Sequence, residues 1–249
     1  GFNDYRGGGH FSGRLTAPLV FAGAVAKQAL AQHGIVVGSH ILQINDIQEE
    51  RFNPMGVSDA ELAELHAKKF AVMDDAVGEK MQERILQAKS ELNSVGGVVE
   101  AIALHLPAGI GAPYFDSVES MLSHALFSVP AVKGIEFGDG FGFAGLTGAE
   151  ANDALHYVDG KVLALTNHNG GVTGGITNGM PLVVRVAIKP TPSIAREQQT
   201  VSLKEQADTT LAIVGRHDPC IVQRAVPVIE AVVAWTLWDL LLEAKKWEK

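Results

Sequence analysis

The chain has 249 residues, of which 47% are hydrophobic and 19% are charged, and its formal net charge at pH 7 is -8. This composition is typical of a globular protein and excludes a disordered chain, while the acidic balance argues against a general nucleic-acid or membrane surface. The single cysteine, Cys220, cannot form an internal disulfide, which favours a reducing cytoplasm.

The N-terminal half alternates predicted helices and strands without a linker rich in Pro, Gly and Ser. In chain order, the predicted elements are a helix over 17–32, a strand over 35–44, helices over 61–69 and 77–92, and a strand over 97–106. Ser58 and Glu61 form a capping box that predicts the start of the second helix. His105 falls in the last strand and is expected to be a hydrogen-bonded core group rather than a catalyst.

The C-terminal half is predicted to contain shorter strands and one long apolar helix. In chain order, the predicted elements are a helix capped at Asp116, strands beginning at 132 and over 162–166, 182–188 and 201–203, and a helix over 221–242 entered at Pro227. The last helix contains Arg224, Glu230 and Asp239, too many charges for a lipid-facing span. We therefore expect a core helix or a subunit-facing helix.

A glycine-rich loop and the strand after it occupy residues 166–193. The loop carries five glycines, which permit positive φ and let a ligand approach the backbone, interleaved with amide and hydroxyl side chains. The strand over 182–188 then delivers Lys189. Exposed N–H groups beside a lysine suit an anionic planar ligand. A long hairpin loop that merely turns the chain is the alternative.

A second glycine run, residues 7–9, precedes the first helix, with Ser12 and Arg14 beside it. Free N–H groups and the positive end of the helix make this segment a candidate anion site. The alternative is a solvated turn.

Two polar clusters leave alternatives open. Arg216, His217 and Asp218 precede the long helix, where they form either a phosphate clamp with a proton acceptor or a local ion pair. Carboxylates between 139 and 153 suggest a folded loop that lines a cavity. Their spacing matches no calcium or zinc pattern, so no metal site is predicted.

Four separated motifs together resemble chorismate synthase, in the order found in that family. They are DYRGGG at 4–9 with Ser12 and Arg14, the stretch 138–153, the Asn-Gly-Gly loop that ends at Lys189 and Pro190, and GRHDP at 215–219. The resemblance extends from residue 1 to about residue 242. It implies an α+β fold, a β-α-β sandwich, in which residues 1–249 form a single domain covering the C-terminal two thirds or more of the family domain.

The resemblance implies an enzyme that converts 5-enolpyruvylshikimate 3-phosphate to chorismate by 1,4-anti elimination of phosphate. The cofactor is reduced FMN, which is not consumed, and the reaction is the last step of the shikimate pathway. A cytoplasmic homotetramer is expected, with no nucleic-acid or membrane partner. The family association also includes NADP, but no nicotinamide-binding motif is visible, so an external flavin reductase is left open as a partner.

The resemblance also assigns roles to individual residues. Those on the substrate are Ser12, Arg14 and Arg216, those on the flavin are Asn169, Lys189, Pro190, Thr191, Pro192 and Ser193, and the catalytic candidates are Asp218 and His217. A substrate with one phosphate and two carboxylates needs several guanidinium groups, and a departing phosphate needs charge stabilisation that grows in the transition state.

The sequence departs from the family pattern at its start, since it lacks the N-terminal region that supplies two histidines usually assigned as catalytic acids. If these residues belong to a longer or nicked chain, we expect chorismate synthase activity. If they are the whole polypeptide, we expect an N-terminally incomplete remnant with little turnover and weak flavin or phosphate affinity. A flavin-binding or interaction module without lyase activity is the alternative class.

Overall fold

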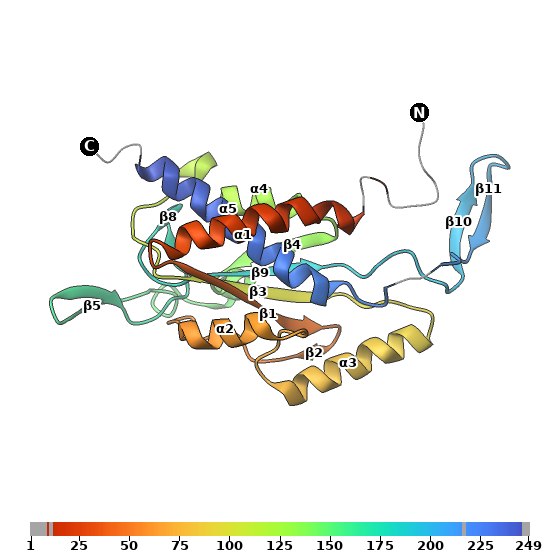
Figure 1. The fold of residues 1–249 in the computed structure, drawn as a ribbon, viewed down its shortest axis with the longest axis horizontal. Coiled ribbons are helices and arrows are strands. Elements are labelled where there is room, and N and C mark those ends of the chain that lie inside the picture. Colours follow the sequence, from red (N-terminus) through yellow and green to blue (C-terminus); the bar gives the residue numbers. More distant parts are fainter. Residues whose placement is uncertain (1–8, 10–11, 216–217, 246–249) are drawn as a thin grey trace.

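The computed structural model describes residues 9, 12–215 and 218–245. At its centre lies an antiparallel sheet of five strands in the order β2-β1-β3-β9-β4 (Figure 1). These strands are β1 (Val36–Ile44), β2 (Ile47–Gln48), β3 (Gly97–Leu104), β4 (Val132–Phe137) and β9 (Leu182–Ile188). β1, β3 and β9 are buried along most of their length, as suits segments rich in β-branched residues.

Three helices cover one face of this sheet in Figure 1: α1 (Ala17–Ala31), α4 (Val118–Phe127) and α5 (Val222–Lys245). α5 supplies much of the core, and Ile229, Val232 and Leu237 have no exposed surface. α1 and α5 cross so closely that a Cβ built on Gly23 would lie 2.2 Å from the Cβ of Ala231.

α5 is also long and apolar enough to cross a membrane by length and composition, and it is the one such helix among the described residues. However, 67% of its most apolar window is buried inside the protein. The apolar character of α5 is therefore accounted for by its place in the core.

The opposite face carries α2 (Asp59–Ala67), and α3 (Asp75–Ser90) lies beside β1 and β2 (Figure 1). α2 closes a second, smaller apolar cluster against the sheet. Its buried members are Phe52, Leu62, Leu65, Ile102, Leu104 and Val183.

Three small hairpins and three short 3-10 helices complete the described part of the chain. The hairpins are β5 (Leu155–Val158) with β6 (Lys161–Ala164), β7 (Val172–Thr173) with β8 (Ile176–Thr177), and β10 (Gln198–Ser202) with β11 (Ala207–Leu211). The 3-10 helices are η2 (Gly13–Thr16), η3 (Tyr114–Asp116) and η4 (Gly140–Gly145). In Figure 1 the β5 and β10–β11 hairpins project from opposite ends of the molecule.

Three local predictions were wrong. The N-cap of α4 is Ser117, whose hydroxyl accepts from the Ser120 amide, and not Asp116. Pro227 lies inside α5 rather than at its entry. His105 lies beyond the end of β3, where it is exposed, has a φ of 61° and pairs with Asp59 at 3.2 Å, so it is not a core group.

The predicted capping box at the start of α2 is confirmed. Ser58 Oγ accepts from the Glu61 amide at 3.2 Å, and Glu61 Oε2 accepts from the Ser58 amide at 2.7 Å. These bonds satisfy two backbone N–H groups that the helix cannot pair itself.

Ser58→Ala is expected to lower the free energy of unfolding by about 1 kcal/mol, because the Glu61 amide loses its acceptor. Urea unfolding followed by circular dichroism measures this loss. Ser90→Ala is the matched control, since the Ser90 hydroxyl only donates to the Gln87 carbonyl at the end of α3. An equal loss in both variants would contradict the role assigned to the cap.

Candidate functional site

Segments that are far apart in the sequence meet at the end of the sheet where β9 finishes. The Val95 amide donates to the Pro219 carbonyl at 2.8 Å, and Ser94 Oγ donates to the Thr191 carbonyl at 2.6 Å. A Cβ built on Gly96 would lie 3.0 Å from Pro190 and 2.3 Å from the Ile188 carbonyl. The turn before β3 therefore holds the predicted flavin segment and the Asp218 segment against each other.

One polar atom at this meeting point, Thr191 Oγ1, is buried without a hydrogen-bond partner. Asp218 Oδ2 is also buried, but it forms an ion pair with Arg224, whose Nη1 lies 2.5 Å away. An orphaned polar atom is costly in a folded protein. The unpaired hydroxyl of Thr191 therefore suits a ligand that carries its own hydrogen-bonding group.

Lys189, Pro190 and Pro192 are exposed, whereas Thr191 and Ser193 are partly buried. The Lys189 amide donates to the Ala131 carbonyl at 2.9 Å, which fixes the backbone where β9 ends and leaves the side chain in solvent. The predicted flavin segment thus presents one exposed cation beside a hydrogen-bonded backbone.

Arg14 lies in η2, just before α1, and Ser12 is the N-cap of η2. Ser12 Oγ accepts from the Arg14 amide at 3.3 Å, and the Arg14 side chain is exposed. In Figure 1 the start of α1 points toward the β10–β11 end of the molecule, and Gln198 at the start of β10 donates to the Pro192 carbonyl at 3.3 Å. The predicted substrate residues and the predicted flavin segment therefore share one end of the fold. Arg216 and His217 lie outside the described residues.

Asn169 lies at the opposite end of the sheet. The carbonyl of its neighbour Gly170 accepts a hydrogen bond from the Val183 amide near the start of β9, whereas Lys189 follows the end of that strand. β9 has seven residues, so at about 3.3 Å per residue the two positions are separated by roughly 20 Å. The structure brings Lys189 to Ser193 together with Asp218, and it does not bring Asn169 to them. The role of Asn169 stays a prediction.

The loop around Asn169 is held by one carboxylate. Asp153 accepts from the His168 amide at 2.7 Å, from the Asn169 amide at 3.0 Å and from Asn169 Nδ2 at 2.8 Å, and Thr166 Oγ1 donates to it at 2.9 Å. Burial opposes ionisation of Asp153, but these hydrogen bonds outweigh it and lower its pKa. The ionised carboxylate thus shapes the loop.

Asn167 ties the same loop to its surroundings and is almost fully buried. Its Nδ2 donates to the carbonyls of Pro54 and Pro181, both at 2.8 Å, and its Oδ1 accepts from the Gly171 amide at 2.7 Å. Beyond it, His168 Nδ1 lies 2.6 Å from Asp139 Oδ2. The glycine-rich loop is therefore a fixed structure rather than a loose turn of the chain.

A cavity of about 610 Å³ opens near this second end. Pro181 and Gly56 line it, as do Leu104, His105 and Met180. None of the predicted substrate or flavin residues that the structure describes lines this cavity. Among the described residues, no cluster of three or more His, Cys, Asp or Glu side chains could hold a metal ion.

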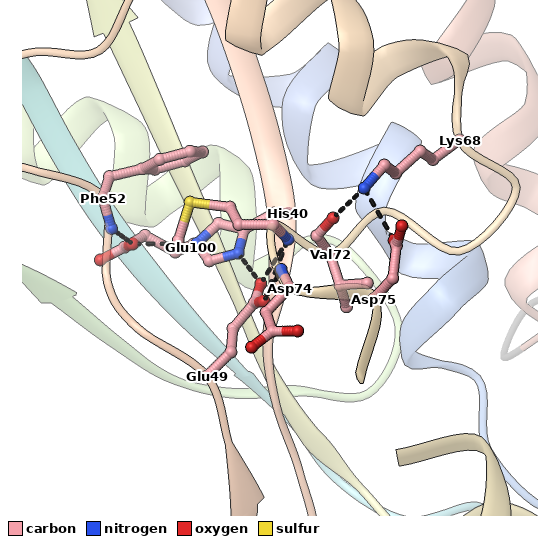
Figure 2. A network of polar contacts seen from close by, with 9 residues as sticks. His40, Glu49, Phe52, Lys68, Val72, Asp74, Asp75 and Glu100 are labelled. Atoms are coloured by element: carbon pink, nitrogen blue, oxygen red, sulfur yellow. Dashed lines mark hydrogen bonds and ion pairs between the residues drawn. The ribbon is translucent and has the colours of Figure 1, made fainter. Parts of the chain in front are cut away.

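Sequence reasoning missed a buried polar network in the sheet itself. His40 lies between two carboxylates: its Nδ1 contacts Glu49, and its Nε2 lies 3.0 Å from Glu100 (Figure 2). Burial alone would lower the pKa of His40, but hydrogen bonds and charge from Glu100 and Glu49 outweigh it and raise that pKa. The signal in the sequence was His40 and Glu100, two ionisable residues inside the apolar strands β1 and β3.

The raised pKa of His40 makes stability depend on pH. A group whose pKa is higher in the folded state stabilises the fold fully below its unfolded pKa, near 6.5, and loses that contribution as pH rises through the folded value. We expect the free energy of unfolding to fall above pH 6.5, by at most about 1.4 kcal/mol per pH unit for this proton.

Urea unfolding between pH 6 and pH 9 measures this slope. His40→Gln should remove the slope, while His124→Gln, at an exposed position on α4, should keep it. If His40→Gln does not fold, the titration of the His40 imidazole followed by NMR reports the same pKa. An ordinary or lowered value would contradict the prediction.

Cys220 is fully buried beside the Asp218 segment. Burial raises the pKa of its thiol to about 11, and a thiol that stays protonated is a poor nucleophile. We assign this residue to packing rather than to chemistry.

Comparison with known proteins gives one consistent family. A sequence model described as chorismate synthase matches residues 1–242. Chorismate synthase of Thermococcus kodakarensis is 47% identical over 248 residues, which is 100% of this chain and 68% of that protein. Chorismate synthase of Pyrococcus abyssi is 46% identical with the same two coverages.

A solved structure gives the same result for the fold. The crystal structure of a chorismate synthase superposes with a TM-score of 0.76 at 30% sequence identity, over 93% of this chain and 64% of that one. This likeness confirms the predicted mixed α+β class and sandwich type. The chain spans 68% of the length of the sequence relatives above and 64% of the solved chain.

Proposed function

Because the chain belongs to the chorismate synthase family, we propose that it acts in the last step of the shikimate pathway. The reaction is 1,4-anti elimination of phosphate from 5-enolpyruvylshikimate 3-phosphate to give chorismate, with reduced FMN that is not consumed. The observation that supports this proposal is the meeting of the Thr191 and Asp218 segments on residues 94–96, where the buried Thr191 hydroxyl has no partner and the Asp218 carboxylate is paired with Arg224.

In this proposal each residue has a separate task at that end of the fold. Arg14, with Arg216, binds the anionic groups of the substrate, since guanidinium groups suit phosphate and carboxylate. Residues 189–193 hold the cofactor, with Lys189 as the exposed cation and Thr191 Oγ1 as a buried hydrogen-bonding group. Residues 189–193 would hold reduced FMN, and the chemistry it would supply there is electron density for the allylic system of the substrate.

Asp218 is the proposed proton acceptor, with His217 as a second candidate. Its carboxylate is held by the exposed Arg224 side chain and lies next to the buried Cys220. A partly buried carboxylate can take a proton from the reacting centre as phosphate leaves. The growing negative charge on phosphate would be met by Arg14 and Lys189.

The test is an anaerobic assay with photoreduced FMN and 5-enolpyruvylshikimate 3-phosphate, in which released phosphate and chorismate absorbance are both measured. Release of both at equal rates supports the proposal. FMN fluorescence quenching without phosphate release would instead indicate a flavin-binding module or an inactive partial chain. The intact mass of the sample shows which polypeptide has been assayed.

Asp218→Asn is expected to lower the rate of phosphate release by about 100-fold, because the amide cannot accept the proton. Asp208→Asn, on the exposed strand β11, is the matched control and should keep the wild-type rate. Equal rates for Asp218→Asn and wild type would remove Asp218 from the mechanism.

We further propose a cytoplasmic homotetramer in which residues 1–249 belong to one domain. Exposed apolar side chains on the two projecting hairpins support subunit contacts, among them Leu155, Tyr157 and Leu203. Light scattering coupled to gel filtration measures the assembly, and a monomer would contradict it. An external flavin reductase, which would draw its electrons from NADPH and release NADP, would be needed if the protein does not itself oxidise added NADPH in the presence of FMN.

A further inference from the structure

A row of four charged side chains crosses the central sheet at one register. His40 on β1 is the Cα partner of Glu100 on β3, Glu100 is the partner of Arg185 on β9, and Arg185 is the partner of Glu136 on β4. Residues paired in this way lie on the same face of a sheet. The side chains of His40, Glu100 and Arg185 are at most 7% exposed.

Buried ions destabilise a fold unless each is paired and hydrogen-bonded, and this row pairs each member with its neighbour. Glu100 Oε2 accepts from the Phe52 amide at 2.7 Å, and its Oε1 lies 3.4 Å from Arg185 Nη1. At the far end, Glu49 accepts from His40 and from the amides of Met73 and Asp74 (Figure 2). That end is anchored on Met73 and Asp74, the two residues just before α3.

The near end of the row finishes on a backbone carbonyl. Arg185 Nη2 donates to Glu136 Oε2 at 3.1 Å and to the carbonyl oxygen of Gly138. Gly138 and Gly140 have φ values of 54° and 55°, a left-handed conformation that favours glycine. Arg185 therefore binds the turn at Gly138, where the backbone of the turn is in the left-handed conformation.

This turn is in direct contact with the glycine-rich loop. The Asp139 amide donates to the His168 carbonyl at 2.8 Å, and the Gly138 amide donates to the Val183 carbonyl at 3.2 Å. A Cβ built on Gly138 would lie 1.9 Å from the His168 carbonyl oxygen and 2.6 Å from the Gly170 amide nitrogen. Any shift of the turn must therefore displace residues 168–170.

We propose that Arg185 is a positioning residue: through the Gly138 carbonyl it holds the turn, and the turn holds residues 167–171 in a ligand-binding conformation. The inference rests on the proposed function through Asn169, which the resemblance assigns to the flavin but which the structure leaves roughly 20 Å from residues 189–193, so an FMN titration tests that assignment together with the anchor. A guanidinium suits this task, since its planar fork donates to several acceptors at fixed angles. A lysine ammonium at the same position would reach fewer of the acceptors that Arg185 binds, which are Glu100, Glu136 and the Gly138 carbonyl.

Amide hydrogen exchange of the whole chain tests the inference without a ligand. In Arg185→Leu, exchange of the amides of residues 138–140 and 168–171 should rise about 10-fold or more, because their hydrogen bonds open without the anchor. Arg185→Lys should give a smaller rise and keeps the test available if Arg185→Leu does not fold. The β10–β11 amides, at the other end of the molecule, should not change.

Glu49→Gln is the matched control. It disturbs the same buried row at the end that does not touch the turn, so a purely structural role for the row predicts the same exchange pattern in all variants. If the loop amides of both Arg185 variants exchange no faster than those of Glu49→Gln, the inference is overturned. A rise confined to the Arg185 variants supports it.

FMN titration, followed by fluorescence quenching, separates the inference from the proposed function. We expect the dissociation constant for FMN to rise at least 10-fold in Arg185→Lys and to change less than 2-fold in Glu49→Gln. If the wild-type chain does not bind FMN, the flavin assignment fails, while the exchange data still decide whether Arg185 positions the loop. If wild type binds and Arg185→Lys binds equally well, the inference fails and the proposed function stands.

Discussion

Replacing Glu100 with glutamine is expected to lower the free energy of unfolding by about 3–5 kcal/mol, the usual loss when one partner of a buried ion pair is removed. Glu100 is fully buried and is shared by His40, the Phe52 amide and Arg185. The neutral side chain would leave a guanidinium buried beside an imidazole without the charge between them. Urea unfolding at pH 6 measures the loss where His40 is protonated.

Asp75→Asn is the control for this prediction. Asp75 pairs with Lys68 at 2.8 Å, but its side chain is 81% exposed, and exposed ion pairs contribute little. We expect no clear change in this variant. A loss in Glu100→Gln as small as that in Asp75→Asn would show that the buried row is not paired as described.

Gly23→Ala is expected to destabilise the fold by about 2–3 kcal/mol, although alanine is the better helix former. Helix propensity alone would predict a gain of about 1 kcal/mol. However, the new Cβ would lie 2.4 Å from the Ala231 Cα and 2.8 Å from the Ala231 carbonyl oxygen, which are backbone atoms that cannot rotate away. The two helices would have to separate, which loses packing along the whole crossing.

Ala24→Gly, on the same helix, measures the effect of helix propensity alone. Ala24 is exposed, so this change should cost only the propensity difference of about 1 kcal/mol. The melting temperature, measured by calorimetry, should therefore fall in both variants and fall further in Gly23→Ala. A rise in Gly23→Ala would mean that α1 and α5 are farther apart than the structure places them.

Much of the fold could be predicted because its signals are local. The capping box of Ser58 and Glu61 and the β-branched run of β9 each predicted an element that the structure contains. The Asp116 cap was misplaced by one residue because Ser117 offers an equally good acceptor. Pro227 was misread as a helix boundary because the packing that keeps α5 continuous across it is tertiary.

The candidate site could be predicted only in part. Resemblance singled out Asp218 and residues 189–193, and the structure places them together. Resemblance could not show that Asn169 lies a strand length from residues 189–193. That distance follows from the fold, in which Asn169 lies near the start of β9 and Lys189 follows its end. Glu100 and Arg185 were missed because a charged residue in a strand ordinarily indicates a solvent-facing position, and only the sheet register reveals that four of them line up.

The contact between α1 and α5 also bears on how the protein reaches this fold. Lys27 on α1 and Glu230 on α5 form an ion pair across 203 residues of chain, and Ile229, Val232 and Leu237 complete the core only from the α5 side. A ribosome releases α5 last of all the described elements. The sheet must therefore wait for α5 with its helix-covered face only partly closed by α1 and α4, and contacts of such long range slow the final step. Newly made chains are most open to aggregation and most in need of a chaperone during that interval.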